Sequence, residues 1–362
     1  MSGDLCRFEA ATCYLCRQTR NDPLPPVRCS IESSTEYSGP QAIDLPPEYI
    51  ERLERLFDGD AKRLKACLHD MAADGPTAFR VNGLQATWEQ VRDELEQVGI
   101  EPDRLDGIDG VWTVPSQSHR ALTDTPAARD GRIYLMTPSS LLPGLCLEPQ
   151  PGEEILDLAA APGGKTLHLA DLMENQGRIA AVEAVKPRFH QLRRNLERCG
   201  AHIVDTYLAD GRGVWRKVPE RFDRVLLDAP CSAEGRIVPG EPDSWKYWSP
   251  RKIKEMAKKQ RRLAESAVHC LKPGGILVYC TCTLAPEENE AIINRLLRRF
   301  GDALEIIDLP LAASIPTEAG RTTWAGKSFH EALSLTRRIV PSPPWEGFYL
   351  ARLRKTASTI PV

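Results

Sequence analysis

Hydrophobic positions follow a helical spacing in the first part of the chain. Between residues 45 and 72 they recur every three or four positions, as at Leu53, Leu56 and Leu68, which predicts amphipathic helices. A short strand is predicted over residues 77–84, and a helix that begins at a threonine cap is predicted over residues 87–98. These elements predict a small α+β unit that ends near Trp112.

Beyond this unit, short apolar runs alternate with longer amphipathic segments. The predicted strands cover residues 133–136, 155–158, 178–182, 206–208, 224–227, 276–280, 304–307 and 347–351. The predicted helices cover residues 138–147, 165–173, 187–199, 250–271 and 286–300, and residues 113–130 are predicted to be a loop. Alternation of this kind is typical of a parallel sheet with helices on both faces. Such sheets bind ligands at the carboxyl ends of their strands.

Two helix starts carry their own expectations. Ser139 and Ser140 are expected to cap the helix over residues 138–147, because a serine hydroxyl accepts the free first-turn amides. Glu287, Glu288 and Glu290 are expected in the first turn of the helix after Pro286, where the helix dipole favours anions.

The first forty residues show no sustained periodicity, so we expect a disordered tail. Their four cysteines are Cys6, Cys13, Cys16 and Cys29. They include one Cys-x-x-Cys pair, the minimal spacing of a zinc knuckle, but a second pair is missing, and we therefore expect no metal site. The expected domains are a tail over residues 1–40, a small α+β domain and linker over residues 41–125, and a main domain over residues 126–356.

The composition, with 42% apolar and 27% charged residues, is that of an ordinary globular protein. The chain contains no run of about 18 apolar residues, and its first thirty residues lack the pattern of a secretory signal. We therefore expect a cytoplasmic, monomeric protein without a membrane contact. In that compartment the 11 cysteines are expected to be reduced.

The overall charge gives no signal for nucleic acid, since the net charge is −3. Residues 48–109 are acidic, with eight Lys or Arg against fifteen Asp or Glu. An RNA contact there would depend on single residues such as Arg80 or Asn82, and a packing role is the alternative.

The predicted helix over residues 250–271 is instead basic. Its cations are Arg251, Lys252, Lys254, Lys258, Lys259, Arg261 and Arg262. Such a run is usually a solvated face, but Trp245, Tyr247 and Trp248 precede it, which favours contact with an RNA backbone.

A glycine-rich turn follows the predicted strand over residues 155–158. Its residues are Ala159, Ala160, Ala161, Pro162, Gly163, Gly164 and Lys165. Small residues let the backbone approach a ligand closely, and the next helix offers free amides. Glu183 follows the next strand, where it suits the two hydroxyls of a ribose, and Asp210 follows the third strand, at the distance of an adenine. This layout is usual for S-adenosylmethionine; a tight structural connection is the alternative.

Two cysteine motifs lie at the ends of two later strands. Asp228-Ala229-Pro230-Cys231 combines a carboxylate, a rigid proline and a thiol, against which a planar ring could be held. In Thr281-Cys282-Thr283 the thiol would be a nucleophile if a positive neighbour or a hydrogen-bond network lowered its pKa. A buried structural cysteine is the alternative in each case. In a parallel sheet both motifs would lie at the same edge.

These motifs, in this order, resemble the RNA (cytosine-5)-methyltransferases of the RsmB/RsmF/Nop/Sun family, and bacterial RsmF-like members in particular. The resemblance rests on Leu156 to Thr166, on Asp228 to Ser232, and on Thr281 to Thr283 followed by Pro286 to Glu290. Flanking pieces agree, including the closing Glu346-Gly347-Phe348-Tyr349. The resemblance covers roughly residues 46–355.

The resemblance implies a Rossmann-like, S-adenosylmethionine-dependent fold and a covalent reaction. It implies that Cys282 adds to carbon 6 of cytosine so that carbon 5 accepts the methyl group, that Asp228 hydrogen-bonds the ring, and that Cys231 helps to release the enzyme. The target base must be unstacked to be reached. The same resemblance implies that the residues from Ala159 to Lys165 line the cofactor together with Glu183, Asp210 and Asp228, and makes Arg188 a further candidate.

The sequence departs from the family pattern at three points. Cys280 stands where serine is commoner, Ala233 replaces a usual glycine, and a C-terminal RNA-binding module is expected to be missing. We expect an RNA substrate, with rRNA favoured over tRNA. The alternative from another class is a non-catalytic RNA-binding factor for ribosome assembly, which the intact cysteines disfavour. An amino-group methyltransferase would fit an Asn/Asp-Pro-Pro-Tyr strand end, which is not present at Asp228.

Overall fold

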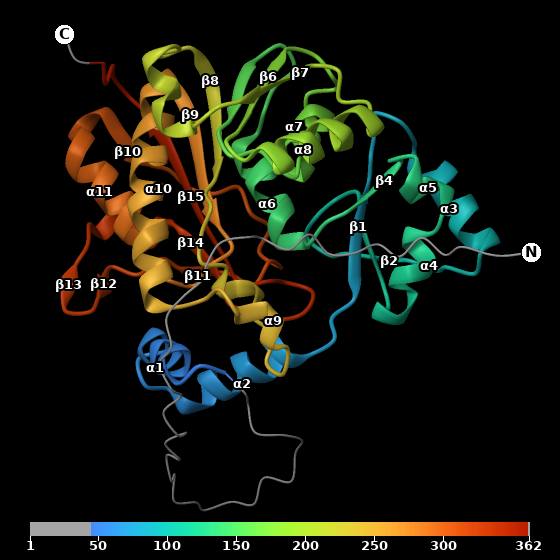
Figure 1. Cartoon of the computed structure of the whole chain (residues 1–362), viewed down its shortest axis with the longest axis horizontal. Helices are drawn as coiled ribbons and strands as arrows, with labels where there is room; N and C mark the ends of the chain where they lie inside the picture. Colours follow the sequence, from blue (N-terminus) through green and yellow to red (C-terminus); the bar gives the residue numbers. More distant parts are fainter. Residues whose placement is uncertain (1–44, 361–362) are drawn as a thin grey trace, which may run out of the picture. The chain divides into compact units, whose positions relative to one another are not determined.

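A sheet of nine strands organises the computed structural model, which describes residues 45–360 (Figure 1). Its order is β11-β14-β15-β9-β8-β5-β6-β7, and β10 pairs with β15. The strands are β5 (Glu154–Asp157), β6 (Arg178–Glu183), β7 (Val204–Leu208), β8 (Phe222–Asp228), β9 (Leu271–Thr281), β10 (Leu304–Ile306), β11 (Glu318–Ala319), β14 (Arg337–Ile339) and β15 (Phe348–Lys355). Strands β5 to β9 are parallel, whereas β15 runs antiparallel to β9. The predicted α/β fold is confirmed; the antiparallel strands at one edge are an addition to it.

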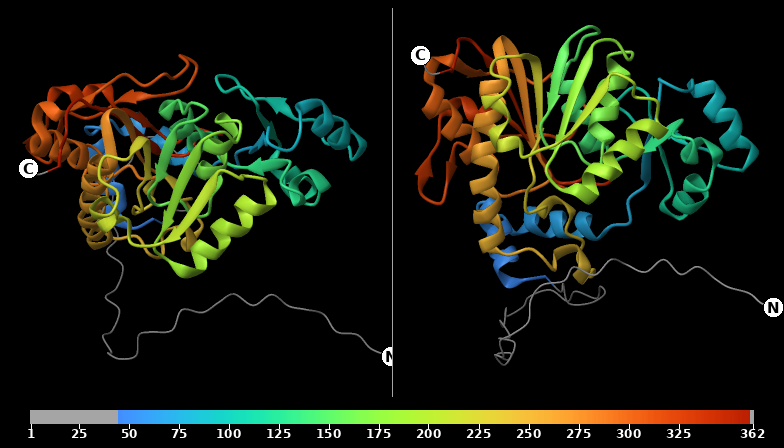
Figure 2. Two further views of the ribbon diagram at one scale, coloured as in Figure 1. Left: turned by 90° about the horizontal axis from the view of Figure 1, so that it is seen from above. Right: turned by 45° about the horizontal axis from the view of Figure 1, so that its top comes forward.

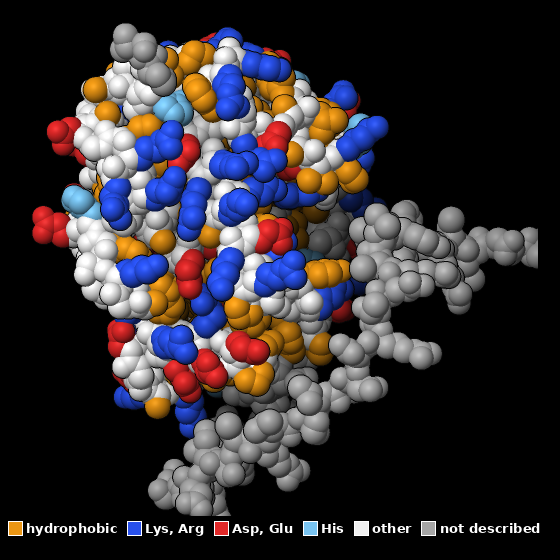
Figure 3. Space-filling view, turned by 60° about the vertical axis from the view of Figure 1, so that its left-hand side comes forward, with side chains coloured by type: hydrophobic (Ala, Val, Ile, Leu, Met, Phe, Trp, Pro, Cys, Tyr) orange, Lys and Arg blue, Asp and Glu red, His pale blue; other side chains and the backbone are white. Residues whose placement is uncertain are grey.

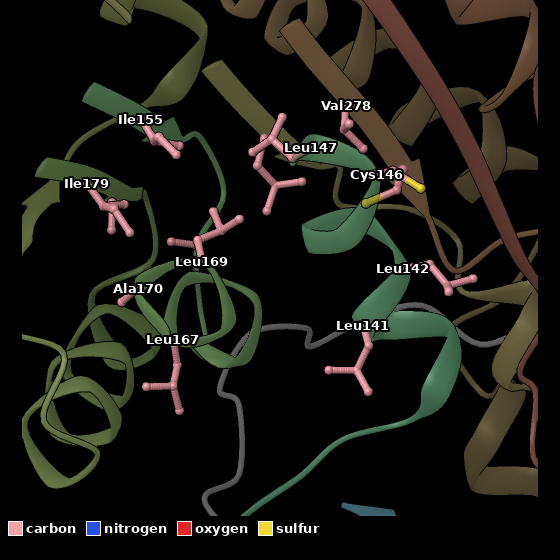
Figure 4. Packing of buried hydrophobic residues seen from close by; sticks show 14 of the residues in the cluster. Leu141, Leu142, Cys146, Leu147, Ile155, Leu167, Leu169, Ala170, Ile179 and Val278 are labelled. Carbon is pink, nitrogen blue, oxygen red and sulfur yellow. The ribbon is translucent and has the colours of Figure 1, made fainter. Parts of the chain in front are cut away.

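Both faces of the sheet are covered because successive residues of a strand point to opposite sides. The flanking helices are α6 (Pro138–Leu147), α7 (Gly164–Leu172), α8 (Lys186–Arg198), α10 (Pro250–Cys270) and α11 (Glu290–Phe300). On one face, Ile155, Ile179 and Val278 pack with residues of α6, α7 and α8 (Figure 4). On the other face, Leu156 and Leu277 pack with residues of α10 and α11. The two hydrophobic cores hold the carboxyl ends of the parallel strands in fixed positions.

A second sheet of four strands, in the order β2-β3-β1-β4, precedes the large one in the chain (Figure 1). Its elements are β1 (Thr77–Val81), α3 (Trp88–Gln97), β2 (Asp103–Arg104), β3 (Val111–Val114), α4 (His119–Thr123), α5 (Pro126–Arg129) and β4 (Ile133–Leu135). The loop predicted over residues 113–130 is therefore wrong, since α5 starts at Pro126 with the Thr125 hydroxyl accepting from the Ala128 amide. Pairing of β4 with β1 carries this sheet across residue 126, the boundary expected between the domains.

Two further helices, α1 (Pro47–Leu56) and α2 (Ala61–Ala72), pack near α9 (Pro242–Trp245) (Figure 2). Their apolar sides form a third core with Ile237 and Leu284. Tyr49 lies at its centre: its ring meets the Trp248 ring edge-on, with 5.2 Å between centroids, and its hydroxyl donates to Glu234 O at 3.1 Å. The predicted tail and the four N-terminal cysteines lie outside the described residues.

The structure corrects the first expectation about helix starts and part of the second. Thr137, not a serine, precedes α6, and Ser139 Oγ instead donates to Glu346 O at 2.9 Å. The helix α11 begins at Glu290, which lies in its first turn as expected. Glu287 and Glu288 lie in the turn before the helix, where they contact other segments. None of the helices within residues 45–360 is long and apolar enough to cross a membrane.

Candidate active site

A cavity of about 590 Å³ lies at the carboxyl ends of the parallel strands. The predicted residues that line it are Ala159, Ala160, Ala161, Pro162, Gly164, Lys165, Glu183, Arg188, Asp210, Asp228, Cys231 and Cys282. Gly163 belongs to the same turn but is not among the lining residues. The structure thus brings the glycine turn and both cysteine motifs into one site.

The glycine turn between β5 and α7 depends on its two glycines. Gly163 adopts a φ of +110°, a left-handed value that residues with a Cβ rarely adopt. A Cβ on Gly164 would lie 2.9 Å from Cε1 of the Tyr134 ring, so only glycine fits beside that ring. Arg188 Nη2 donates to Ala161 O at 2.6 Å and holds the turn from α8.

Two acidic residues expected near a nucleoside take different positions. Glu183 is buried at the end of β6, and its Oε1 accepts from the Val185 amide at 2.8 Å. Asp210 is exposed and accepts from Arg212 Nε at 2.9 Å, and this hydrogen bond lowers the pKa of Asp210. Glu183 therefore presents an oriented carboxylate, while the Asp210 carboxylate is already paired with an arginine.

Asp157 lies in the stretch that carries the resemblance, but no function was expected of it. It ends β5, lines the cavity and is buried, and burial raises its pKa to about 7. Its Oδ2 accepts from Thr166 Oγ1 at 2.6 Å, but Oδ1 has no hydrogen-bond partner within the described part of the chain. The sequence contained one signal for a site here, namely a carboxylate at the end of an apolar strand.

The two cysteine motifs meet because β8 and β9 are neighbouring parallel strands. Their register pairs Asp228 with Cys280, which places the residues that follow each strand side by side. Cys231 Sγ and Cys282 Sγ lie 3.4 Å apart, although 51 positions separate them in the chain. Both thiols are only partly buried, so each is accessible from the cavity.

Electrostatics make these two thiols unequal. The hydrogen bond from Cys231 lowers the pKa of the Cys282 thiol, and the charges of Arg236 and Lys165 lower it further, against the effects of burial and of Asp228. The same hydrogen bond, with burial, raises the pKa of Cys231 well above its usual value. The arrangement therefore favours a thiolate on Cys282 and a proton on Cys231.

Asp228 is held between a cation and a third thiol. Lys165 Nζ lies 2.7 Å from its Oδ2, and the Cys280 thiol donates to its Oδ1 at 3.5 Å. Burial raises the pKa of Cys280 well above its usual value, and the charge of Asp228 adds to this effect, so Cys280 stays a thiol. Cys280 thus acts as a hydrogen-bond donor to Asp228, a function that a serine could also perform.

A buried carboxylate, Glu288, supports the loop that carries Cys231. Its Oε1 accepts from the Ser232 amide at 3.0 Å and from Gln260 Nε2 at 2.9 Å, and Gln260 also donates to Pro230 O at 2.9 Å. Burial raises the pKa of Glu288 to about 8. The sequence did not predict this function of Glu288, because no local pattern predicts that its partner is Ser232, 56 positions away.

The loop after Cys231 is tightly constrained. Ala233 adopts a left-handed φ of +59°, where glycine fits at lower cost, in accord with the usual glycine at this position. The Gly235 amide donates to Cys282 O at 3.0 Å, which ties the two motifs together. A Cβ on Gly235 would lie 2.0 Å from Gly347 O, so the backbones approach too closely for any side chain.

Two other residues that line the cavity are Arg236, which had no sequence signal for a site, and Glu346, which belongs to the closing stretch that supports the resemblance. Arg236 Nε lies 3.2 Å from Glu346 Oε2, and both side chains reach the cavity from segments about 110 positions apart. The positive charge of Arg236 lies close enough to Cys282 to favour its thiolate.

Arg80 and Asn82, named from the sequence as possible RNA contacts, are buried instead. Arg80 Nη1 donates to Asp171 Oδ2 at 2.5 Å. Asn82 Nδ2 donates to the carbonyl oxygens of Gly131 and Cys199, each at 2.8 Å. Both residues join the four-stranded sheet to the large domain, so the expectation that either contacts RNA is wrong.

The seven predicted cations all lie on α10, and their side chains are exposed or partly exposed. Apolar residues of the same helix, including Ile253, Met256 and Leu263, are buried. Lys259 lines the cavity. The basic helix therefore reaches the site through Lys259, while its contact with RNA stays a prediction.

Comparison with known proteins identifies relatives for most of the chain. The family described as "16S rRNA methyltransferase RsmB/F" matches residues 144–354. "Ribosomal RNA small subunit methyltransferase F" of Serratia proteamaculans is 36% identical over 332 residues, which cover 89% of this chain and 66% of that protein. The protein of the same name from Cronobacter sakazakii is 42% identical over 243 residues, covering 67% of this chain and 48% of that protein. The chain thus spans less than two thirds of the length of these relatives.

Solved structures agree with the fold. The "Methyltransferase Homolog Protein from Pyrococcus Horikoshii" is 32% identical, with a TM-score of 0.71 over 86% of this chain and 100% of that chain. "NSun6 from Pyrococcus horikoshii with SFG" has a TM-score of 0.73 over 86% of this chain and 99% of that chain. At 22% identity, this second match supports the fold alone.

Proposed function

This chain belongs to the 16S rRNA methyltransferase RsmB/F family, and on that premise we propose that it methylates carbon 5 of a cytosine in RNA, with S-adenosylmethionine as the methyl donor. The family expected from the three motifs is thereby confirmed. The proposal is carried by one observation, the 3.4 Å approach of Cys231 and Cys282 within a cavity that the glycine turn also lines. Ribosomal RNA in the cytoplasm is the proposed substrate, since curated relatives are named as enzymes of the small ribosomal subunit.

The residues around the glycine turn fit S-adenosylmethionine. The unpartnered Asp157 Oδ1 would be satisfied by a donor or a positive charge that enters the cavity, because a buried polar atom without a partner is costly. Glu183 offers a buried carboxylate for ribose hydroxyls, and the first turn of α7 offers free amides. When bound there, the cofactor supplies an electrophilic methyl group.

The first step belongs to Cys282. Carbon 5 of cytosine is a weak nucleophile, so the Cys282 thiolate first bonds to carbon 6, and the electron pair of the double bond becomes available at carbon 5. The lowered pKa of Cys282 favours this thiolate over the thiol. Asp228, fixed by Lys165 and Cys280, hydrogen-bonds the ring and orients it.

The second step belongs to Cys231. Its pKa is high as long as Cys282 carries the negative charge and accepts its proton in a hydrogen bond. Once the Cys282 sulfur is bonded to carbon 6, both effects are removed, so Cys231 ionises more easily. After carbon 5 has accepted the methyl group, Cys231 gives up its proton to water, and the resulting thiolate takes the proton from carbon 5. The electron pair of that bond restores the double bond, and the Cys282 sulfur leaves as a thiolate.

Methyl transfer from tritiated S-adenosylmethionine, followed by nucleoside analysis, tests the proposal. We expect labelled 5-methylcytidine in 16S rRNA or small subunits, none with Cys282→Ala, and near wild-type labelling with Cys67→Ala, whose thiol is buried outside the cavity. Label in tRNA alone would contradict the proposed substrate. RNA binding without methylation of any RNA would contradict the enzyme and favour an assembly factor.

A further inference from the structure

A second cavity, of about 610 Å³, lies between α10, α11 and the hairpin of β12 (Thr323–Trp324) and β13 (Lys327–Ser328). Its lining residues are Arg261, Ala291, Asn294, Arg295, Arg298, Arg299, Lys327 and Phe329. Five of these eight residues are cations, and none is acidic. We refer to this cavity as the basic groove.

The positive charge of the basic groove is only partly balanced. Arg295 and Arg299 share one carboxylate, that of Glu265, at 3.3 and 3.4 Å. The side chains of Arg261, Arg298 and Lys327 are exposed, and none of them makes an ion pair or a hydrogen bond within residues 45–360. Like charges held in one groove repel each other, so a bound anion would be stabilised there.

The helix α10 connects the basic groove to the active site. Lys259 lines the first cavity and Arg261, two positions further, lines the groove. Exposed Arg251, Lys254, Lys258 and Arg262 follow each other at three- or four-residue steps, so they form a strip about 16 Å long on one side of the helix. Figure 3 shows Lys and Arg side chains gathered in a broad band on the side of the molecule turned forward there, with few Asp and Glu among them.

We propose that the basic groove binds the phosphate backbone of the RNA strand that flanks the target base. This inference rests on the proposed function, because it takes RNA to be the substrate. When one base of an RNA strand enters the active site, the nucleotides on either side of it must continue across the surface of the protein. The strip adds exposed cations on the helix that carries Lys259 of that site and Arg261 of the groove. A single small anion would need two or three of these cations, whereas a polyanion uses all of them. The contact is to phosphates, so it adds affinity without sequence preference.

The test compares two triple variants of the full chain. The groove variant is Arg261→Ala/Arg298→Ala/Lys327→Ala, and the control is Lys62→Ala/Arg120→Ala/Lys217→Ala, which removes three exposed cations that line neither cavity. Binding of a fluorescent single-stranded fragment of 16S rRNA is measured by anisotropy over a range of salt concentrations. Circular dichroism confirms that both variants are folded.

Each lost phosphate contact lowers the salt slope by about 0.7, so the groove variant should lose about 2 from its slope and bind about 100-fold more weakly near 0.1 M salt. The control should stay within a few-fold of the wild type. A groove variant that binds like the control, with an unchanged slope, would overturn the inference.

Methylation of the same RNA separates the two proposals. If the wild type forms 5-methylcytidine while the groove variant binds like the control, the groove assignment fails and the proposed function stands. If the groove variant loses affinity while the wild type methylates nothing, the proposed function fails and the groove remains an RNA site.

Discussion

The Cys231→Ala substitution tests how the active site produces a thiolate. In the structure the Sγ atoms of Cys231 and Cys282 lie 3.4 Å apart, and the hydrogen bond between them is the largest cause of the lowered pKa of Cys282. A hydrogen bond to a charged group contributes about 1.5–3 kcal/mol. Its loss should therefore raise the pKa of Cys282 and reduce its thiolate population at neutral pH by roughly 10-fold or more.

Alkylation by iodoacetamide without RNA measures this population, because only the thiolate reacts. The rate at the Cys282 peptide is followed by mass spectrometry between pH 5 and 10, which separates it from the other thiols. With Cys231→Ala the profile should move to higher pH, and at pH 7 the rate should fall by about 10-fold or more. Cys231→Ser is the matched control, since its hydroxyl still donates, and it should remain close to the wild type. Coincident profiles for wild type and Cys231→Ala would refute the reasoning.

Three further predictions concern the side chains behind the cysteines. Lys165→Met removes the ion pair with Asp228 and should lower the free energy of unfolding by about 1–3 kcal/mol in urea denaturation; an unchanged value would contradict it. Cys280→Ser keeps a donor to Asp228 and should retain methyl transfer within about twofold, whereas Cys280→Val should lower the rate by about 10-fold; equal rates would exclude this function of Cys280. The pKa of Glu288 is raised to about 8, so its contribution to stability is complete below about pH 4.5 and is lost as the pH rises through 8. In urea denaturations at a series of pH values, the free energy of unfolding of Glu288→Gln should therefore fall less with rising pH than that of the wild type. Parallel curves of free energy against pH for the two proteins would contradict this prediction.

The fold followed from local patterns where the packing itself is local. Short apolar runs alternate with amphipathic helices along the chain, and this alternation predicted a parallel sheet covered on both faces. Ile155 and Leu156 of one strand indeed pack into two different cores. The glycine turn and the two cysteine motifs each follow a parallel strand, so their meeting at one edge was also predictable. The unpredicted antiparallel placement of β15 depends on pairing with β9 at a distance in sequence of about 70 positions, for which the local pattern carries no information.

The rest of the site could not be predicted because it depends on contacts between distant segments. Glu288 was expected at a helix start, yet its burial beside Ser232 arises from the turn before α11. Arg80 carries a charge and was expected at a surface, but Asp171 of α7 compensates that charge within the protein. Cys280 was unexplained until the register of β8 and β9 placed it opposite Asp228.

The most direct measurement for the proposed reaction is the identity of the atom that bonds to the RNA. Cys231→Ala is incubated with S-adenosylmethionine and 16S rRNA, the RNA is digested with nuclease, and the peptides are mapped by mass spectrometry. We expect a methylated cytidine attached to the peptide that contains Cys282, and no such adduct with Cys231→Ala/Cys282→Ala. An adduct at another cysteine, or methylated RNA formed by Cys282→Ala without any adduct, would contradict it.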